Sequence, residues 1–415
     1  MPKYLVPTLA ALALLSSCGG SSNGLTNTIG GGGGGGGGTS TPNSTPLTVE
    51  IGPAGASYIN IPFVTITVCA PGTQNCQTIE NIEVDTGSSG VRILASVLNA
   101  SLLSALPQQF YGATSVPVAE CAQFADGYSW GPVVAADVGI ASEKASGIAV
   151  QVIGDSNFIQ IPADCSGPVP NEEDTVATFG ANGIIGVGVF AQDCGDSCAQ
   201  GVISGTYYQC PTNGGGCIGI TEADSMQVSN PVTSFAADNN GVIVELPNVA
   251  ADGAVSVTGS LIFGIGTQSN NAFGSATVLE TDPTTGTLDV TFGGTDYPLS
   301  LLDTGSNALY FNDNSLSMCA QGTAGAGFYC TPANLAATIT TASATQLTAS
   351  FSIGDASTMI EANPTGAAFP QLAGPIGSAT PQTFDFGLPY FYGRPVFVAI
   401  EGMTADGVTG PFFAY

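Results

Sequence analysis

The sequence predicts an all-β chain built from two related halves. A Val-Asp-Thr-Gly-Ser-Ser-Gly stretch at residues 84–90 is repeated as Leu-Asp-Thr-Gly-Ser-Asn at residues 302–307. Each copy ends a pair of segments in which apolar and polar residues alternate, as they do in β-hairpins. Helical periodicity of useful length is scarce. These observations indicate a diverged tandem duplication.

A hairpin delivers the aspartate of each copy, Asp85 in the first half and Asp303 in the second. An apolar segment that contains glycine follows each copy, so both halves share one order of elements. We expect the first hairpin at residues 63–68 and 79–84, the second at 287–292 and 297–302 around a Gly293-Gly294 turn, and the glycine segments at 181–188 and 384–390.

Composition excludes several classes of function. With 415 residues, 44% hydrophobic and 8% charged, the chain can bury a large core. Its net charge of −27 repels nucleic acid and anionic lipid. No histidine is present, which excludes Ser-His and Cys-His catalysis and histidine-ligated zinc. Acid–base chemistry therefore falls to carboxylates, and we expect a monomer with no cofactor, no metal and no nucleic-acid partner.

The first 17 residues resemble a bacterial lipoprotein signal peptide. One lysine precedes an apolar run, Leu9 to Leu15, which is too short to span a membrane, and Leu-Ser-Ser then precedes Cys18. The resemblance implies cleavage before Cys18 and acylation of its thiol. Gly19 favours the outer membrane of the envelope, with membrane contact through the lipid anchor alone. The alternative is an ordinary signal peptide with an unrelated cysteine.

Residues 18–46 are predicted to be a flexible tether. They are rich in Gly, Ser, Thr, Asn and Pro, with nine consecutive glycines at 30–38, and cannot bury enough apolar surface to fold. The folded part is expected to divide into an N-terminal lobe at residues 47–265 and a C-terminal lobe at residues 266–415.

Ten cysteines follow Cys18, and an even number in an exported protein predicts disulfides. A metal site at Cys194 and Cys198 is the competing interpretation, although no histidine or further close thiolate completes a tetrahedral set. Close spacing predicts the pairs 69/76, 194/198, 210/217 and 319/330, and leaves Cys121 with Cys165.

Two Asp-Thr-Gly-Ser turns suit peptide hydrolysis without metal. One carboxylate takes a proton from water while a second, protonated carboxyl gives one to the carbonyl oxygen. We therefore predict Asp85 and Asp303 as catalytic residues, with Gly87 and Gly305 allowing the close turn and Ser88 and Ser306 donating to the carboxylates. For a single copy, an Asx-turn at a strand end would be the alternative.

From about residue 50 to the end, the chain resembles the pepsin-like aspartic proteases. The resemblance rests on the two Asp-Thr-Gly-Ser turns, the hydrophobic-hydrophobic-glycine segment at 181–188 and the strand at 259–264. It implies two related β-barrel-like lobes with an active-site cleft between them. It also implies that Thr86 and Thr304 cross-link the turns through their hydroxyls. Bacterial exported lipoproteins of undefined function with a doubled Asp-Thr-Gly motif are similar.

The stretch at 124–131 resembles the flap that closes over substrate in that family, with Phe124, Tyr128 and Trp130 as the substrate-binding residues. Phe124 stands where the family has a tyrosine, so Tyr128 or Trp130 would have to replace the missing hydroxyl. A second departure is Asp385, which interrupts the apolar pair before Gly387. We expect Asp385 to turn to solvent; the alternative is a third carboxyl near the pair that perturbs its proton sharing.

Arg92, seven residues after Asp85, is expected to form a structural pair with a carboxylate, with substrate binding as the alternative. The sequence as a whole predicts an envelope-tethered aspartic endopeptidase that cuts extended polypeptide. A catalytically inactive protein of the same fold, which binds a polypeptide or envelope partner in the cleft, is the alternative.

Overall fold

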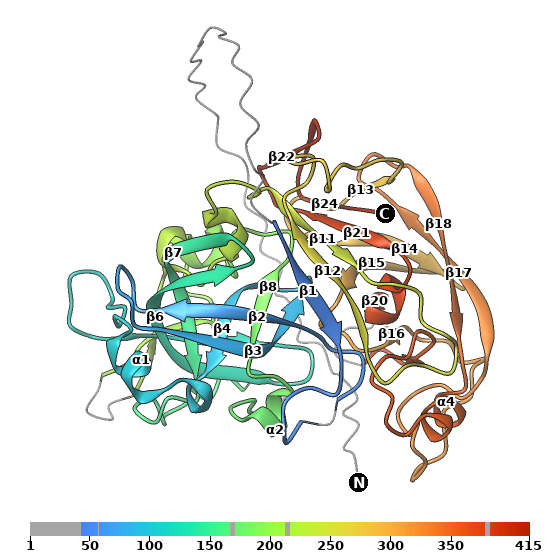
Figure 1. Cartoon of the computed structure of the whole chain (residues 1–415), viewed down its shortest axis with the longest axis horizontal. Coiled ribbons are helices and arrows are strands. Elements are labelled where there is room, and N and C mark those ends of the chain that lie inside the picture. Colours follow the sequence, from blue (N-terminus) through green and yellow to red (C-terminus); the bar gives the residue numbers. More distant parts are fainter. Residues whose placement is uncertain (1–42, 57, 167–170, 212–215, 378–381) are drawn as a thin grey trace, which may run out of the picture.

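The computed structural model describes residues 43–56, 58–166, 171–211, 216–377 and 382–415 (Figure 1). The predicted signal segment, Cys18 and the glycine run lie outside these residues. The tether was predicted to end at residue 46, which is too late, because β1 (Ser44–Val49) pairs along its whole length with β12 (Val257–Phe263). Leu47 and Val49 of β1 are buried, so apolar contacts as well as ladder hydrogen bonds hold this strand.

The first half contains a closed β-barrel. Its strands pair in the order β2-β3-β8-β4-β7-β6, and β6 also pairs with β2, which closes the ring. Closure removes exposed strand edges, and isoleucine and valine dominate the buried side chains. The barrel strands are β2 (Pro62–Cys69), β3 (Cys76–Asp85), β4 (Ser89–Leu94), β6 (Tyr128–Ile140), β7 (Glu143–Ile153) and β8 (Gly183–Val187).

A small three-stranded extension lies against β6. In it, β5 (Val118–Gln123) pairs with β6 and with β9 (Tyr207–Gln209), and β9 pairs with β10 (Ile218–Gly219). Its buried cluster consists mainly of aromatic and cysteine side chains. Cross-links supplement the small core here, as expected for a layer that buries little apolar surface.

A shared sheet joins the two halves. Its neighbouring strands are β2-β1-β12-β11-β21-β24-β13, so strands from both ends of the folded chain lie side by side at the centre of the molecule (Figure 1). The strands not yet located are β11 (Gly241–Glu245), β13 (Val278–Glu280), β21 (Pro395–Ala399) and β24 (Phe412–Ala414).

The second half is built on a seven-stranded sheet in the order β18-β17-β14-β15-β20-β16-β19. Aromatic rings fill its core, among them Phe311 and Phe384, which stack with centroids 5.0 Å apart. The strands are β14 (Leu288–Phe292), β15 (Thr295–Asp303), β16 (Leu309–Tyr310), β17 (Ala333–Thr340), β18 (Gln346–Ile353), β19 (Ala373–Gly374) and β20 (Asp385–Gly387); β22 (Thr404–Ala405) and β23 (Val408–Thr409) form a separate ribbon.

The helices are short, and the predicted all-β class is confirmed. The α-helices are α1 (Ala100–Ala105), α2 (Val176–Phe179), α3 (Asp196–Gln200) and α4 (Ala356–Ala362), and the 3₁₀ turns are η1 (Ala95–Val97), η2 (Asp224–Met226), η3 (Pro231–Ser234) and η4 (Leu388–Phe391). In the described part of the chain, no helix has both the length and the apolar character needed to cross a bilayer.

Both predicted hairpins are present, as β2–β3 and β14–β15. The second turns at Gly293 and Gly294, whose φ angles of 58° and 80° suit glycine. The five predicted disulfide pairs are all formed, including Cys121–Cys165. Because Cys194 is bonded to Cys198, the metal-site interpretation of these two cysteines is wrong.

Candidate active site

The two Asp-Thr-Gly-Ser turns meet, and their buried threonines cross-link them. The backbone N–H of Thr86 donates to Thr304 Oγ1 at 3.1 Å, and the backbone N–H of Thr304 donates to Thr86 Oγ1 at 3.0 Å. Each hydroxyl donates in turn to the opposite half, to the carbonyl of Leu302 at 2.9 Å and that of Val84 at 2.6 Å. Four reciprocal hydrogen bonds therefore fix one turn against the other.

The carboxyl groups of Asp85 and Asp303, called the dyad below, are hydrogen-bonded to each other. A Cβ atom at Gly87 would lie 2.7 Å from Asp303 Oδ1, and one at Gly305 would lie 2.8 Å from Asp85 Oδ1. Each glycine is therefore required because the opposing carboxyl occupies the space of its missing side chain. Asp85 is 5% exposed and Asp303 is partly exposed, so the dyad is nearly enclosed but keeps one accessible side.

The neighbouring turn residues donate to the dyad. The backbone N–H of Gly87 donates to Asp85 Oδ1 at 2.7 Å, and that of Gly305 donates to Asp303 Oδ1 at 2.8 Å. The outer oxygens accept from side chains, Asp85 Oδ2 from Ser88 and Asp303 Oδ2 from Ser306 at 2.9 Å. Every supporting residue predicted in the two turns thus contacts the dyad or the opposite turn.

The same arrangement of strands lies beneath each turn. Asp85 is opposite Gly186 where β3 runs parallel to β8, and Asp303 is opposite Gly387 where β15 runs parallel to β20. A Cβ atom at either glycine would come within 2.7 Å of the backbone of the turn above it. The predicted glycine segments therefore let the two layers approach closely.

The expectation that Asp385 turns to solvent is wrong. Asp385 is 1% exposed, and its Oδ2 lies 2.5 Å from Ser306 Oγ. The single hydroxyl proton of Ser306 goes to Asp303, so Asp385 must carry a proton of its own and donate it to Ser306. Burial raises the pKa of Asp385 to about 8, helped by the charge of Asp85 and opposed by the Ser306 hydrogen bond. Asp385 is the neutral third carboxyl of the alternative interpretation.

Asp303 is the member of the dyad that holds the shared proton. Burial raises its pKa well above the usual range, and the negative charges of Asp85 and Asp385 and the hydrogen bond with Asp85 act in the same direction. Two adjacent carboxyls cannot both ionise easily, so the dyad carries one proton over a usable pH range.

The predicted flap is the β5–β6 hairpin, but only one predicted substrate-binding residue lies in its turn. Phe124 is partly exposed there and meets Phe179 edge to face with ring centroids 6.1 Å apart. Tyr128 and Trp130 are 6% and 2% exposed in the core of the extension, and the Trp130 N–H donates to the carbonyl of Phe158 at 2.7 Å. Their burial excludes the prediction that one of them presents a replacement for the missing tyrosine hydroxyl.

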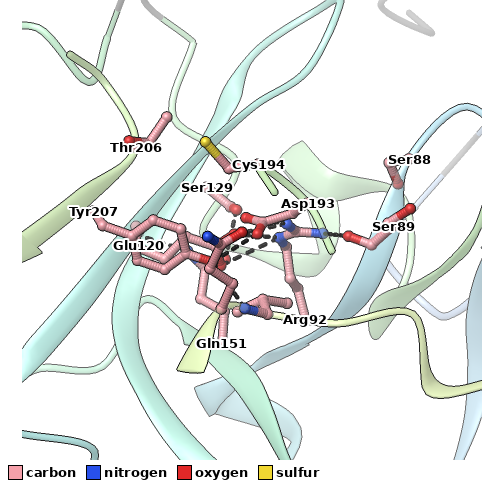
Figure 2. Close-up of polar contacts among 12 residues, drawn as sticks. Ser88, Ser89, Arg92, Glu120, Ser129, Gln151, Asp193, Cys194, Thr206 and Tyr207 are labelled. Carbon is pink, nitrogen blue, oxygen red and sulfur yellow. Dashed lines mark hydrogen bonds and ion pairs between the residues drawn. The ribbon is translucent and has the colours of Figure 1, made fainter. Parts of the chain in front are cut away.

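Arg92 has the structural role that was expected. Its guanidinium is 3% exposed and lies 2.6 Å from Glu120 and 3.4 Å from Asp193 (Figure 2). It also donates to the carbonyl of Ser89 at 3.0 Å, directly after the first turn (Figure 2). Tyr207 donates to the far oxygen of Asp193 at 2.7 Å. This network ties the back of the first turn to the extension.

The sequence analysis missed Tyr310, which follows Asp303 at the spacing of seven at which Arg92 follows Asp85. Its buried hydroxyl donates to Asn307 at 2.6 Å. Burial raises its pKa well above the usual range, as do the charges of Asp385, Asp126 and Asp303. Tyr310 therefore lies near both the dyad and the hairpin turn, and the repeated spacing was the signal for it.

Three acids near Asp85 were also missed, namely Glu83, Asp126 and Glu173. Glu83 could have been found from its place two residues before Asp85, because alternate residues of a strand share a face. Within the described chain, the one group of potential metal ligands that converges is Cys319, Cys330 and Asp355. Its cysteines form a disulfide, so it is not a metal centre.

The fold and site together define a class: a two-halved β protein of the pepsin-like type, with a buried carboxyl dyad built from paired Asp-Thr-Gly-Ser turns. A family model described as "Protein of unknown function (DUF3443)" matches residues 39–415, and the chain belongs to that family. The chain is similar to the crystal structure of aspartic proteinase from Irpex lacteus, at 15% identity and a TM-score of 0.47, over 89% of this chain and 96% of that chain. No curated protein matches the sequence.

Proposed function

We propose that this protein is an aspartic endopeptidase that hydrolyses extended polypeptides. The observation that supports this most is the contact between Asp85 and Asp303, one from each half, with Gly87 and Gly305 leaving room for the opposite carboxyl. Opposed carboxyls that share one proton provide a base and an acid at the same site.

In the proposed mechanism a water molecule lies between the two carboxyls. The Asp85 carboxylate takes a proton from this water as its oxygen attacks the peptide carbonyl carbon. Asp303 gives its proton to the carbonyl oxygen, which produces a neutral tetrahedral diol. Collapse of the diol breaks the C–N bond, as the proton on Asp85 passes to the leaving nitrogen and a hydroxyl proton returns to Asp303. Both aspartates end as they began.

The donors around the dyad hold this chemistry in place. Gly87, Ser88, Gly305 and Ser306 donate to the carboxyl oxygens, so neither carboxyl can rotate freely. Preorganised donors of this kind avoid reorganisation during the reaction. A polypeptide bound as an extended strand would present its backbone carbonyls to the dyad.

We further propose that the enzyme acts at the bacterial cell envelope, lipid-anchored through Cys18, with the outer membrane as the expected site. This proposal rests on the lipobox-like Leu-Ser-Ser-Cys stretch and on the tether that follows it. The net charge of −27 is consistent with a membrane contact made by the lipid alone.

Incubation of the purified protein with a reduced, unfolded polypeptide between about pH 3 and pH 7 tests the proposal, since a carboxyl must remain protonated. We expect cleavage that a peptide containing a hydroxyl-bearing transition-state mimic suppresses. No cleavage at any of these pH values would exclude the enzyme.

One observation favours a second candidate, a non-catalytic protein that binds polypeptide at the same place. The hairpin turn carries Phe124, which has no hydroxyl to offer a substrate, and Tyr128 and Trp130 are buried. Saturable binding of an unfolded polypeptide without cleavage, lost when the dyad is altered, identifies this candidate.

A further inference from the structure

Three carboxyl groups gather beside Asp85 and are called the acidic cluster here: Glu83, Asp126 and Glu173. Glu83 lies on β3 on the same face as Asp85, and Asp126 lies in the turn of the β5–β6 hairpin. The Asp126 and Glu173 side chains are hydrogen-bonded to each other. Elements far apart in the sequence therefore bring three acids to one place.

Segment 171–173 holds Glu173 against the hairpin. Tyr128 N–H donates to the carbonyl of Asn171, and Glu173 N–H donates to the carbonyl of Tyr128, both at 2.9 Å. A Cβ atom at Gly127 would lie 2.5 Å from Glu173 Oε1. The carboxyl of Glu173 thus packs against the hairpin where the turn ends.

No positive charge within the described residues compensates for the acidic cluster. Glu83 and Glu173 are each 7% exposed, and the Glu83 carboxyl accepts no hydrogen bond from any described residue. Arg92 pairs with Glu120 and Asp193, while Lys144 pairs with Asp137. Arg394, the remaining described cation, donates to backbone carbonyls. Buried acids without a partner are costly to the fold, which points to a ligand that pairs with them.

The electrostatics show that these groups face one another and the dyad. Burial raises the pKa of Glu83 well above its usual range, followed by the charges of Asp85 and Asp126. Burial raises the pKa of Glu173 similarly, followed by the charge of Asp126, their hydrogen bond and the charge of Glu83. Burial, then the charges of all three cluster acids, raises the pKa of Tyr58 to about 12.

We propose that the acidic cluster is a subsite for the ammonium or guanidinium group of a lysine or arginine in the polypeptide substrate, next to the bond that is cut. This inference rests on the proposed function. Glu83 and Asp126 lie close enough to feel the charge of Asp85, so a side chain bound by them lies beside the dyad. Tyr58 and Phe124, partly buried against a neighbouring apolar cluster, offer surface to the methylene stem.

The spacing of the acids favours an organic cation over a metal ion. The carboxyl oxygens of Glu83, Asp126 and Glu173 do not all lie within 4.8 Å of one another, since the described residues contain a single such group and it lies elsewhere. A metal ion requires its ligands close around one point. A side chain with several N–H donors can reach oxygens that are spread further apart.

The test uses peptide pairs that differ by one residue, lysine or norleucine, placed at each position on either side of the cleaved bond. At one position we expect kcat/KM to favour lysine by about ten-fold or more, and Glu83→Gln or Asp126→Asn to remove most of that preference. The matched control is Glu143→Gln, which alters an acid of the same half that is 8% exposed and not in the cluster. It should keep the preference for lysine.

A binding measurement separates failure of the subsite from failure of the proposed enzyme. Calorimetry with Asp303→Asn protein should show tighter binding of the lysine peptide than of the norleucine peptide, and adding Glu83→Gln should remove the difference. Cleavage of norleucine peptides with no lysine preference overturns the subsite and leaves the enzyme standing. Lysine-selective binding without any cleavage does the reverse. Calcium binding that Glu83→Gln abolishes, with no lysine preference, overturns the subsite in favour of a metal site.

Discussion

Glu83 and Asp385 occupy opposite strands of the same strand pair in the two halves. In the parallel ladder of β3 and β8, Glu83 is opposite Ile184, whereas in that of β15 and β20 Leu301 is opposite Asp385. Both acids are buried, at 7% and 1% exposure. Each half therefore contributes one additional carboxyl beside the dyad, and the two serve different purposes. Asp385 supports Asp303 through Ser306, while Glu83 faces the place where we expect substrate.

Replacing either dyad residue should abolish cleavage. Asp85→Asn and Asp303→Asn keep the shape of the side chain and remove the titrating group, so we expect kcat to fall by on the order of 10²- to 10⁴-fold or more with the fold intact. The double variant should be little worse than either single one, because the two carboxyls act as a unit. Steady-state kinetics and circular dichroism measure both effects. A single variant that cleaves like wild type contradicts the assignment.

The pH profile of cleavage should be bell-shaped with its maximum on the acidic side. Activity should rise as the first proton leaves the dyad and fall as the second leaves, since one carboxyl must stay protonated. The raised pKa of Asp303 moves the falling limb towards higher pH. Measurement of kcat/KM from about pH 3 to pH 8 checks this, and a profile that keeps rising to pH 8 would exclude the dyad as catalyst.

Stability should fall as the pH rises from about 4 to about 8. Burial raises the pKa of Asp385 to about 8, so the folded protein keeps a proton that the unfolded chain releases near its ordinary pKa of 3.8. The stabilisation is thus present below about pH 4 and is lost as the pH rises through the folded value. Asp385→Asn, which mimics the neutral carboxyl, should flatten this dependence and retain most of the cleavage activity at acidic pH. Thermal unfolding across this range tests it, and an unchanged slope in the variant counts against a protonated Asp385.

The disulfides should differ in their contribution to stability. Cys121–Cys165 spans 44 residues and Cys194–Cys198 spans 4. By the loop-entropy model, removing the first with paired serine substitutions should cost about 4 kcal/mol and removing the second about 2 kcal/mol. Urea unfolding measures both. Thiol titration of denatured, unreduced wild-type protein should find no free cysteine among the ten that follow Cys18.

The anchor proposal is tested by Cys18→Ser. Because acylation requires the thiol, we expect wild-type protein to partition with membranes and the variant to be released or mislocalised. Mass spectrometry of the mature N-terminus provides the independent measurement. A soluble wild-type protein with an unmodified terminus would contradict the proposal.

Local patterns predicted much of the fold and the centre of the site. The two hairpins, the Asp-Thr-Gly-Ser turns and the glycine segments each depend on residues close in sequence, and each was predicted within a few positions. The reciprocal threonine hydrogen bonds came from the family resemblance. The closure of the barrel through β2 and β6 could not be predicted, because that pairing joins strands far apart in sequence.

The errors concern charged and aromatic residues whose surroundings are set by tertiary contacts. A lone acid in an apolar strand is ordinarily expected to face solvent, and only the hydroxyl of Ser306 explains why Asp385 does not. Tyr128 and Trp130 were assigned by their nearness to Phe124 in sequence. They lie on one face of β6, which packs against the Cys121–Cys165 disulfide, and no local pattern indicates that cover.

The shared sheet determines when this chain can finish folding. Its inner strand β24 (Phe412–Ala414) pairs with β21 and β13, and β21 pairs in turn with β11 beside β12 and β1. The edge of the first half thus stays uncovered until the end of the chain has been synthesised. High contact order of this kind slows folding and lengthens the life of exposed strand edges. An exported chain gains from such a delay, because a polypeptide that cannot fold early stays threadable through a secretion pore until every strand is available on the far side.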